Sequence, residues 1–346
     1  MQICHVNLAR GFSGGERQTL QLIIEQLRLG YQLTVVAIKD SPFSEEVKKL
    51  SCKLVLTTHF LFQHKKSITM DCQLIHVHEG RAIYWALMQS VRFSIPYIVT
   101  RRIDNPLKNK WISIKAYKRA SAIVGLSSAI VDAVKVRYPN ANIYKIPSSP
   151  VSYPINRIQL SDIINEFADK FIVILAGNLL AHKGHYTAVE AARLLENKLP
   201  KVHFIFVGDG PEKDNLLDQA SELKNITFVG KQTDMGTWFA AANLFIHPSY
   251  SEGLGSVILE ALQAGLPVIG TRAGGIPDII EDQVSGLLVD VRDEQALANA
   301  IARIVVDESL KNKLVIGGQE KLKQFEIGYT AALYQTLYKD LNPQGC

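Results

Sequence analysis

The chain has 346 residues, of which 47% are hydrophobic and 21% charged, with 23 Gly, 13 Pro and four Cys. This composition excludes collagen-like, coiled-coil and wholly disordered proteins, and the length suggests two domains of roughly 150 residues each. Residues 1–150 carry 21 Lys and Arg against 9 Asp and Glu, whereas residues 151–346 carry 17 against 24. We therefore expect a basic and an acidic domain with different partners.

Short β-branched runs alternate with amphipathic helical segments along the whole chain. In the first half the expected strands are residues 3–8, 33–38, 53–56, 74–78, 96–100, 122–125 and 143–146. In the second half they are residues 171–176, 202–207, 226–229, 244–247, 267–270 and 286–289. Because this alternation builds parallel sheets covered by helices, we expect an α/β protein with two Rossmann-like, doubly wound domains.

A proline-rich segment divides the pattern. Three prolines fall within residues 147–154, which can continue neither a strand nor a helix, so we place the linker there. The expected domains are residues 1–150 and 151–328. The terminal stretch, residues 329–346, has Leu and Tyr at helical spacing and is expected to pack back on the first domain. Ligands of such sheets bind beyond the carboxyl ends of the strands, so two facing sheets would enclose a cleft.

The cysteines and the first residues favour a cytoplasmic protein. Cys4, Cys52, Cys72 and Cys346 form no CxxC pair, which predicts reduced thiols rather than a disulfide or zinc framework. No signal-peptide core is visible at the start, and no apolar run approaches the ~18 residues of a membrane span. The basic half could also hold the protein at the inner face of an anionic cytoplasmic membrane.

The strongest motif runs from His247 to Ala261 and reads H-P-S-Y-S-E-G-L-G-S-V-I-L-E-A. A strand ends near His247, a loop with two glycines follows, and a helix begins near Ser256, whose first amides form an anion site. Glu252 and Glu260 lie on either side of that site. Two carboxylates cannot both face a diphosphate, but they can bracket one and hold hydroxyls at its two ends. A nucleotide-diphosphate sugar has that layout.

This segment resembles the Glu-x7-Glu motif of glycosyltransferase family 4. A-G-L-P-V-I at residues 264–269 and G-G-I-P-D at residues 274–278 extend the likeness, which is strong over residues 171–290 and looser over residues 1–150. The resemblance implies the GT-B fold, two Rossmann-like domains facing a central cleft. It implies a retaining, metal-independent hexosyltransferase without a cofactor. Its donor would be a nucleotide-diphosphate sugar, and its acceptor a glycan or glycolipid of lipopolysaccharide or capsule.

A second loop, residues 176–184, joins a strand to a helix through Lys183 and Gly184. Lys183 can place a compact positive charge on a leaving diphosphate. The family usually has an arginine where this chain has Asn178. Either Asn178 donates a neutral hydrogen bond, or another cation substitutes. The alternative for Lys183 is an exposed lysine at a helix start.

Glycines and histidines follow strand ends in the first half. Gly14 and Gly15 lie in a loop that, in the family, abuts the donor phosphates; a plain tight turn is the alternative. His76 and His78 share one face of a strand and could bind a metal, but no third ligand is evident in the sequence. The resemblance places His78 at the reacting sugar, whereas His76 fits a buried core residue.

Charged residues after the first-half strands suggest an anionic acceptor. Arg101 and Arg102 stand where many family members have a histidine, and arginine forks suit phosphate or carboxylate. An exposed ion pair with Asp104 is an equal alternative. The basic, aromatic segment 108–119 could lie on an anionic membrane, or it forms a solvated helix.

The residues and the resemblance together predict three sets of site residues and no metal. The catalytic residues are His78, Glu252 and Lys183. The donor-binding residues are Gly14, Gly15, Asn178, Lys183, Gly253, Leu254, Gly255, Ser256, Val257 and Glu260. The acceptor-binding residues are Arg10, Glu79, Arg81, Arg101 and Arg102. Two alternatives stay open: a non-catalytic nucleotide-sugar-binding subunit of a glycan-synthesis complex, and a nucleic-acid-binding protein, for which no motif is present.

Overall fold

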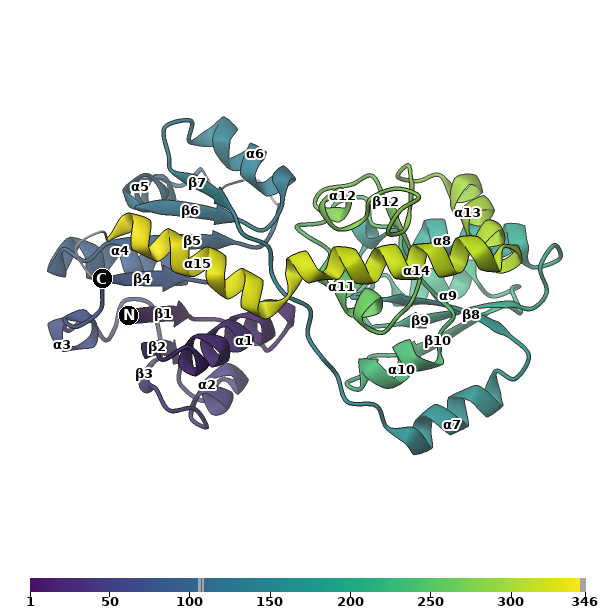
Figure 1. Cartoon of the computed structure of the whole chain (residues 1–346), viewed down its shortest axis with the longest axis horizontal. Helices are drawn as coiled ribbons and strands as arrows, with labels where there is room; N and C mark the ends of the chain where they lie inside the picture. The colour runs from purple at the N-terminus through teal and green to yellow at the C-terminus, as the bar shows by residue number, and fades with distance from the viewer. Residues whose placement is uncertain (105–106, 108, 343–346) are drawn as a thin grey trace. The chain divides into compact units, whose positions relative to one another are not determined.

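The computed structural model describes residues 1–104, 107 and 109–342 (Figure 1). Lys108, from the basic segment, and Cys346 lie outside the described residues. The chain forms two compact units: Met1–Val151 with the end of the chain from Phe325, and Ser152–Gln324. The division falls within the proline-rich segment. The terminal stretch joins the first unit at Phe325, slightly before residue 329.

The first unit contains a parallel sheet in the order β3-β2-β1-β4-β5-β6-β7. Its strands are β1 (Gln2–Asn7), β2 (Gln32–Ile38), β3 (Lys53–Thr57), β4 (Leu74–Val77), β5 (Tyr97–Arg101), β6 (Ala122–Gly125) and β7 (Ile143–Lys145). Its helices are α1 (Gly14–Arg28), α2 (Pro42–Val47), α3 (Lys66–Thr69), α4 (Ala82–Phe93), α5 (Trp111–Arg119), α6 (Ser128–Arg137) and α15 (Ile327–Leu341). The strand order reverses between β1 and β4, which makes that position the switch point of the sheet.

The second unit contains a parallel sheet in the order β10-β9-β8-β11-β12-β13. Its strands are β8 (Phe171–Ala176), β9 (Val202–Val207), β10 (Ile226–Gly230), β11 (Leu244–His247), β12 (Val268–Thr271) and β13 (Leu287–Val289). Its helices are α7 (Arg157–Glu166), α8 (His185–Leu195), α9 (Lys213–Gln219), α10 (Met235–Ala241), α11 (Ser256–Gln263), α12 (Ile276–Ile279), α13 (Glu294–Val306) and α14 (Glu308–Leu322), with 3-10 turns at Ala181–Lys183 and Lys323–Phe325. The switch point here lies between β8 and β11.

Every strand predicted from the sequence is present, and no strand end differs from its prediction by more than one residue. The predictions succeed because the central strands are covered on both faces and therefore read as continuous apolar runs. All six residues of β9 are buried, for example. The predicted fold class, two Rossmann-like domains with parallel sheets, is confirmed.

Helix α15 completes the core of the first unit. Its Tyr334, Leu337 and Tyr338 are buried in the same apolar cluster as Ile3 of β1 and Ile98 of β5. Figure 1 shows α15 beside α1, on one face of the sheet of this unit. None of the described helices has both the length and the hydropathy needed to cross a bilayer.

Candidate functional site

The switch point of the second sheet gathers ionisable side chains from two loops. The loop after β8 leads to Lys183, in the 3-10 turn before α8, and the loop after β11 carries Glu252. His247 is the last residue of β11 itself. In parallel α/β sheets, the carboxyl ends of the strands on either side of the switch point are where ligands bind. The fold therefore brings two of the predicted catalytic residues, Lys183 and Glu252, together at such a position.

One oxygen of Glu252 is the centre of this cluster. Lys183 Nζ lies 2.5 Å from Glu252 Oε2, and His247 Nε2 lies 2.8 Å from the same oxygen. The Oγ of Ser249 is 3.1 Å from His247 Nε2. The side chains of Glu252 and Lys183 are 15% and 20% exposed, so the ion pair is partly desolvated but open to a ligand. Sequence reasoning assigned no role to His247, although its place at a strand's carboxyl end was a signal.

The electrostatics of the cluster keep Glu252 ionised. Burial raises the pKa of the Glu252 carboxyl, but the hydrogen bonds and charges of His247 and Lys183 outweigh burial and hold that pKa well below its usual range. Burial lowers the pKa of His247, although its bond to Glu252 partly opposes this effect. A neutral His247 therefore donates its Nε2–H to the carboxylate at neutral pH.

Two glycines allow the loops to approach each other. Gly184 has φ +71°, and a Cβ added there would lie 1.8 Å from the carbonyl oxygen of Pro248. Gly274 has φ +52°, and its added Cβ would lie 1.9 Å from the carbonyl oxygen of Glu252. Any other residue at either position would push the neighbouring loop away. Both glycines thus fix the backbone on which Glu252 is held.

Two helices begin at this cluster without a side-chain cap among the described residues. The N-cap of α11 is Gly255 (φ +88°), and the N-cap of α8 is Gly184. Uncapped first-turn amides are available to an anion. Ser256 and Val257, the predicted phosphate contacts, are half-buried at the start of α11. Glu260 lies further along α11 and is 8% exposed.

Asn178, in the loop after β8, is exposed and carries no charge. A second cation reaches the neighbourhood from the loop after β13. The Arg292 guanidinium lies 4.8 Å from the centre of the Tyr250 ring, and the Tyr250 hydroxyl is 2.9 Å from Thr187 Oγ1 of α8. Sequence reasoning missed Arg292, because nothing in its local sequence links it to α8.

The first unit has a different kind of cluster at its own switch point. His76 of β4 and His78, the residue after β4, lie beside His5 of β1, and all three are at most 1% exposed. His5 Nδ1 is 2.8 Å from His78 Nε2. Burial, above all, lowers the pKa of each of the three imidazoles. Sequence reasoning missed His5, because strand neighbours distant in the chain cannot be read from spacing.

These histidines are the one set of three candidate metal ligands found among the described residues, with ligand atoms within 4.8 Å of one another. The environment does not suit a metal ion. Both nitrogens of each ring have a hydrogen-bond partner in the protein, and Arg102 Nη2 lies 3.4 Å from His78 Nδ1. A buried guanidinium beside the rings opposes a second cation.

The other residues predicted at the first unit's carboxyl edge differ in their contacts and exposure. The Glu79 carboxylate accepts hydrogen bonds from the backbone N–H groups of Arg81 and Ala82, both at 2.7 Å, and so caps the start of α4. Burial raises the pKa of Glu79. Arg81 is exposed, as are Arg10 and Gly14, whereas Gly15 is half-buried and Arg101 is buried.

Gly15 lies against Arg102, because a Cβ added at Gly15 would be 3.4 Å from Arg102 Cδ. Arg102 donates to Gln18 and Ser148 from Nη1 and approaches Thr19 and His78 with Nη2. The Glu16 carboxylate accepts from the Ser13 N–H, so the start of α1 already has an acid beside it.

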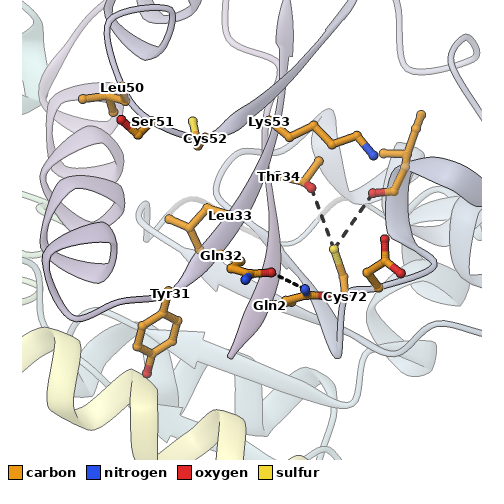
Figure 2. A pocket seen from close by; sticks show the side chains of 12 residues that line it. Gln2, Tyr31, Gln32, Leu33, Thr34, Leu50, Ser51, Cys52, Lys53 and Cys72 are labelled. Carbon is orange, nitrogen blue, oxygen red and sulfur yellow. Dashed lines mark hydrogen bonds between the residues drawn. The ribbon is translucent and has the colours of Figure 1, made fainter.

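A cavity of about 550 Å³ opens at the opposite edge of the first sheet (Figure 2). It is lined by the first residues of β1, β2 and β3 and by Cys72, just before β4. It therefore lies at the amino ends of the strands, away from the histidine cluster of this unit. Cys4, Cys52 and Cys72 are free cysteines in this structure.

Comparison with known proteins identifies the family. The family model described as "Glycosyl transferases group 1" matches residues 156–321. The lipopolysaccharide core biosynthesis glycosyltransferase LpsE of Rhizobium meliloti (strain 1021) is 38% identical over 158 residues, which cover 45% of each chain. The 2-deoxystreptamine N-acetyl-D-glucosaminyltransferase of Niallia circulans is 30% identical over 268 residues, which cover 69% of each chain. The match spans about half the length of the first of these relatives.

Solved structures show the same fold over nearly the whole chain. Anabaena HepE in complex with UDP gives a TM-score of 0.82 at 20% identity, covering 98% of this chain and 100% of that one. The lipopolysaccharide outer core galactosyltransferase WaaB, in its apo form, gives 0.74 at 14% identity, covering 97% and 98%. The fold is that of the GT-B glycosyltransferases. On the strength of the family match and the long relative, this chain belongs to the group 1 glycosyltransferases.

Proposed function

We propose that the protein is a retaining hexosyltransferase, which moves a sugar from a nucleotide-diphosphate sugar to a glycan or glycolipid of a surface polysaccharide such as lipopolysaccharide or capsule. Family membership supports the reaction class, and the similarity to LpsE, a glycosyltransferase of lipopolysaccharide core biosynthesis, supports the pathway. The observation that carries the proposal is the cluster of Lys183, Glu252 and His247 beside two uncapped helix starts at the second unit's switch point.

In the donor complex, the diphosphate would lie against the first amides of α11, at Ser256 and Val257, with the loop Gly253–Gly255 beneath it. Lys183 would leave the Glu252 carboxylate and bind the phosphate, because a diphosphate carries more negative charge than one carboxylate. A positive Lys183 and fixed amides would then stabilise the leaving diphosphate. This donor set needs neither a metal nor a cofactor, so we propose a metal-independent reaction.

Glu252 would bind hydroxyls of the donor sugar. The buried His247 holds Oε2, and the other oxygen, Oε1, would accept from these hydroxyls. Loss of Lys183 to the phosphate leaves the His247 bond in place, so the carboxylate keeps its orientation when the donor binds. Glu260, deeper along α11, would accept from ribose hydroxyls. The roles of His78 at the reacting sugar, and of the first unit in binding the acceptor, stay predictions.

The first experiment is a thermal-shift screen of UDP, GDP, ADP and their sugars, followed by a sugar-transfer assay with the donor that binds. A ligand selective for the folded state raises the melting temperature by mass action. Glu252→Ala and Lys183→Ala should each abolish transfer. Glu222→Ala and Lys224→Ala, exposed residues of the same unit, are the matched controls and should keep full activity.

Full activity of both site variants would overturn the proposal. Binding of a nucleotide sugar without turnover, over a broad panel of glycan acceptors, would instead favour a non-catalytic nucleotide-sugar-binding subunit.

We also propose a peripheral contact of the first unit with an anionic membrane, at the inner face of the cytoplasmic membrane. Trp111, at the start of α5, is 74% exposed, and Lys115 and Lys118 of the same helix are exposed. An exposed indole beside lysines suits the interface of an anionic bilayer. Co-sedimentation with vesicles containing phosphatidylglycerol, but not with pure phosphatidylcholine, is expected. Unchanged sedimentation of Trp111→Ala would refute the role of this helix.

A further inference from the structure

A continuous chain of polar side chains crosses the core of the first unit. It joins elements from both ends of the sequence: β1, α1, β4 and β5 from the beginning, and α15 from the end. Its members are Arg102, His78, His5, Gln26, Tyr338, His76, Thr100 and Tyr334. Nearly all of these side chains are buried, so water cannot complete their hydrogen bonds. These polar groups must therefore find their donors and acceptors within the protein itself.

The first half of this chain has only one consistent direction. A guanidinium has no acceptor, so Arg102 Nη2, at 3.4 Å, requires an unprotonated Nδ1 on His78. A neutral His78 then carries its proton on Nε2 and donates it to His5 Nδ1 at 2.8 Å. His5 in turn carries its proton on Nε2 and donates to Gln26 Oε1 at 2.7 Å.

The second half follows from the amide of Gln26. With Oε1 accepting from His5, the Gln26 Nε2 donates to the Tyr338 hydroxyl at 3.3 Å. That hydroxyl is free to donate to His76 Nδ1 at 2.7 Å, which leaves the His76 proton on Nε2. His76 donates it to Thr100 Oγ1 at 2.7 Å, and Thr100 donates to the Tyr334 hydroxyl at 2.8 Å. In this direction each of these hydrogen bonds joins one donor to one acceptor.

We infer that Arg102 is a positioning residue: it heads a one-way hydrogen-bond chain that fixes His78, His5 and His76 as neutral Nε2–H tautomers and joins α15 to the carboxyl edge of the sheet. Arg102 acts on the far histidine, His76, only through the intervening groups. The inference does not rest on the proposed transferase activity. It also gives His78 one defined ring orientation, because both of its nitrogens have a fixed partner.

The surrounding charges agree with neutral rings. The pKa of each histidine is lowered by burial, and for His78 also by the charges of His76, His5 and Arg102. The pKa of Tyr334 and of Tyr338 is raised by burial, so both hydroxyls keep their protons. Glu16 of α1 is the acid that acts on Arg102, and Tyr31 is the further group that acts on Tyr338. A protonated histidine here would add a cation to a buried site that already holds Arg102.

The test is the tautomer of each histidine in the full chain, read from two- and three-bond 15N–1H correlations of 15N-histidine-labelled protein at pH 7.5. We expect the Nε2–H pattern for His5, His76 and His78. Arg102→Met removes the donor to His78 Nδ1, so the His78 Nδ1 resonance should shift. A His78 in the Nδ1–H form in the parent protein, or a His78 spectrum unchanged by Arg102→Met, would overturn the inference.

A second pair of variants decides the matter if Arg102→Met does not fold. Tyr338→Phe removes the donor to His76 Nδ1, so the His76 resonances should move while those of His5 and His78 keep the Nε2–H pattern. Tyr334→Phe is the matched control, because Tyr334 only accepts at the end of the chain; it should leave all three histidine patterns unchanged. Equal effects of the two phenylalanine variants on His76 would contradict a directed chain, since both tyrosines are buried on the same helix.

Discussion

Acidification should destabilise the first unit through His5. Burial lowers the pKa of His5 to about 4, from an ordinary value of 6.5, although its bond to Gln26 partly opposes this effect. The unfolded chain therefore binds a proton near pH 6.5 that the folded unit binds only near pH 4. The contribution of neutral His5 to the free energy of unfolding is fully present above about pH 6.5 and is lost as the pH falls toward 4. By pH 4.5, His5 alone lowers the free energy of unfolding by about 2.5 kcal/mol.

Urea titrations followed by tryptophan fluorescence measure this loss. In a Trp238→Phe background the emission comes from Trp85 and Trp111, both in the first unit. The free energy of unfolding should fall steeply between pH 7.5 and 4.5. His5→Gln should start from a lower stability at pH 7.5 but lose about 2.5 kcal/mol less on acidification. His59→Gln, at an exposed position of the same unit, should keep the steep fall. If the free energy of unfolding fell equally in the parent, the His5→Gln variant and the His59→Gln variant, His5 would not be the source of the loss.

Three further outcomes follow from the second unit. Lys183→Ala should weaken the binding of the nucleoside diphosphate about 10- to 100-fold in calorimetry, since one charge-assisted hydrogen bond is lost, and a change below about twofold would argue against a phosphate contact. His247→Ala should lower kcat/KM, because Glu252 loses the hydrogen bond that orients it. His247→Gln keeps an N–H donor and should retain part of the kcat/KM that His247→Ala loses. Equal losses in both variants would point to a role of His247 in packing alone. Gly184→Ala should lower the free energy of unfolding by more than about 3 kcal/mol, because Gly184 has a positive φ and an added Cβ would collide with Pro248. Gly177→Ala is the control: its added Cβ meets nothing within 4 Å, so the variant should melt within a few degrees of the parent.

The strands of both sheets could be predicted from the sequence because a strand buried on both faces is a short, continuous run of apolar residues. The runs at β8 and β9 are apolar along their whole length, and turn residues bound them. The loops after β8 and β11 could be placed at one edge for a similar reason: parallel strands end on the same side. Lys183 and Glu252 are therefore neighbours in the structure.

Other features depend on contacts that no local pattern records. His5 meets His78 only because β1 lies beside β4, and Tyr338 meets His76 only because the last helix returns to the first unit. The use made of a charged side chain is equally hidden. Glu79 and Arg102 are charged residues that follow strands, as ligand-binding residues often do. In the structure the Glu79 carboxylate caps α4, and the Nη atoms of Arg102 bind groups of the protein.

Hydrogen exchange of the full chain shows directly whether the nucleotide binds at Lys183 and Glu252 in the second unit. The exchange is compared with and without a saturating nucleoside diphosphate, the one among UDP, GDP and ADP that raises the melting temperature most. Binding should slow exchange in residues 177–187 and 248–257, at the starts of α8 and α11. Slower exchange in the first unit alone, with neither of these loops affected, would contradict a donor site built on Lys183 and Glu252.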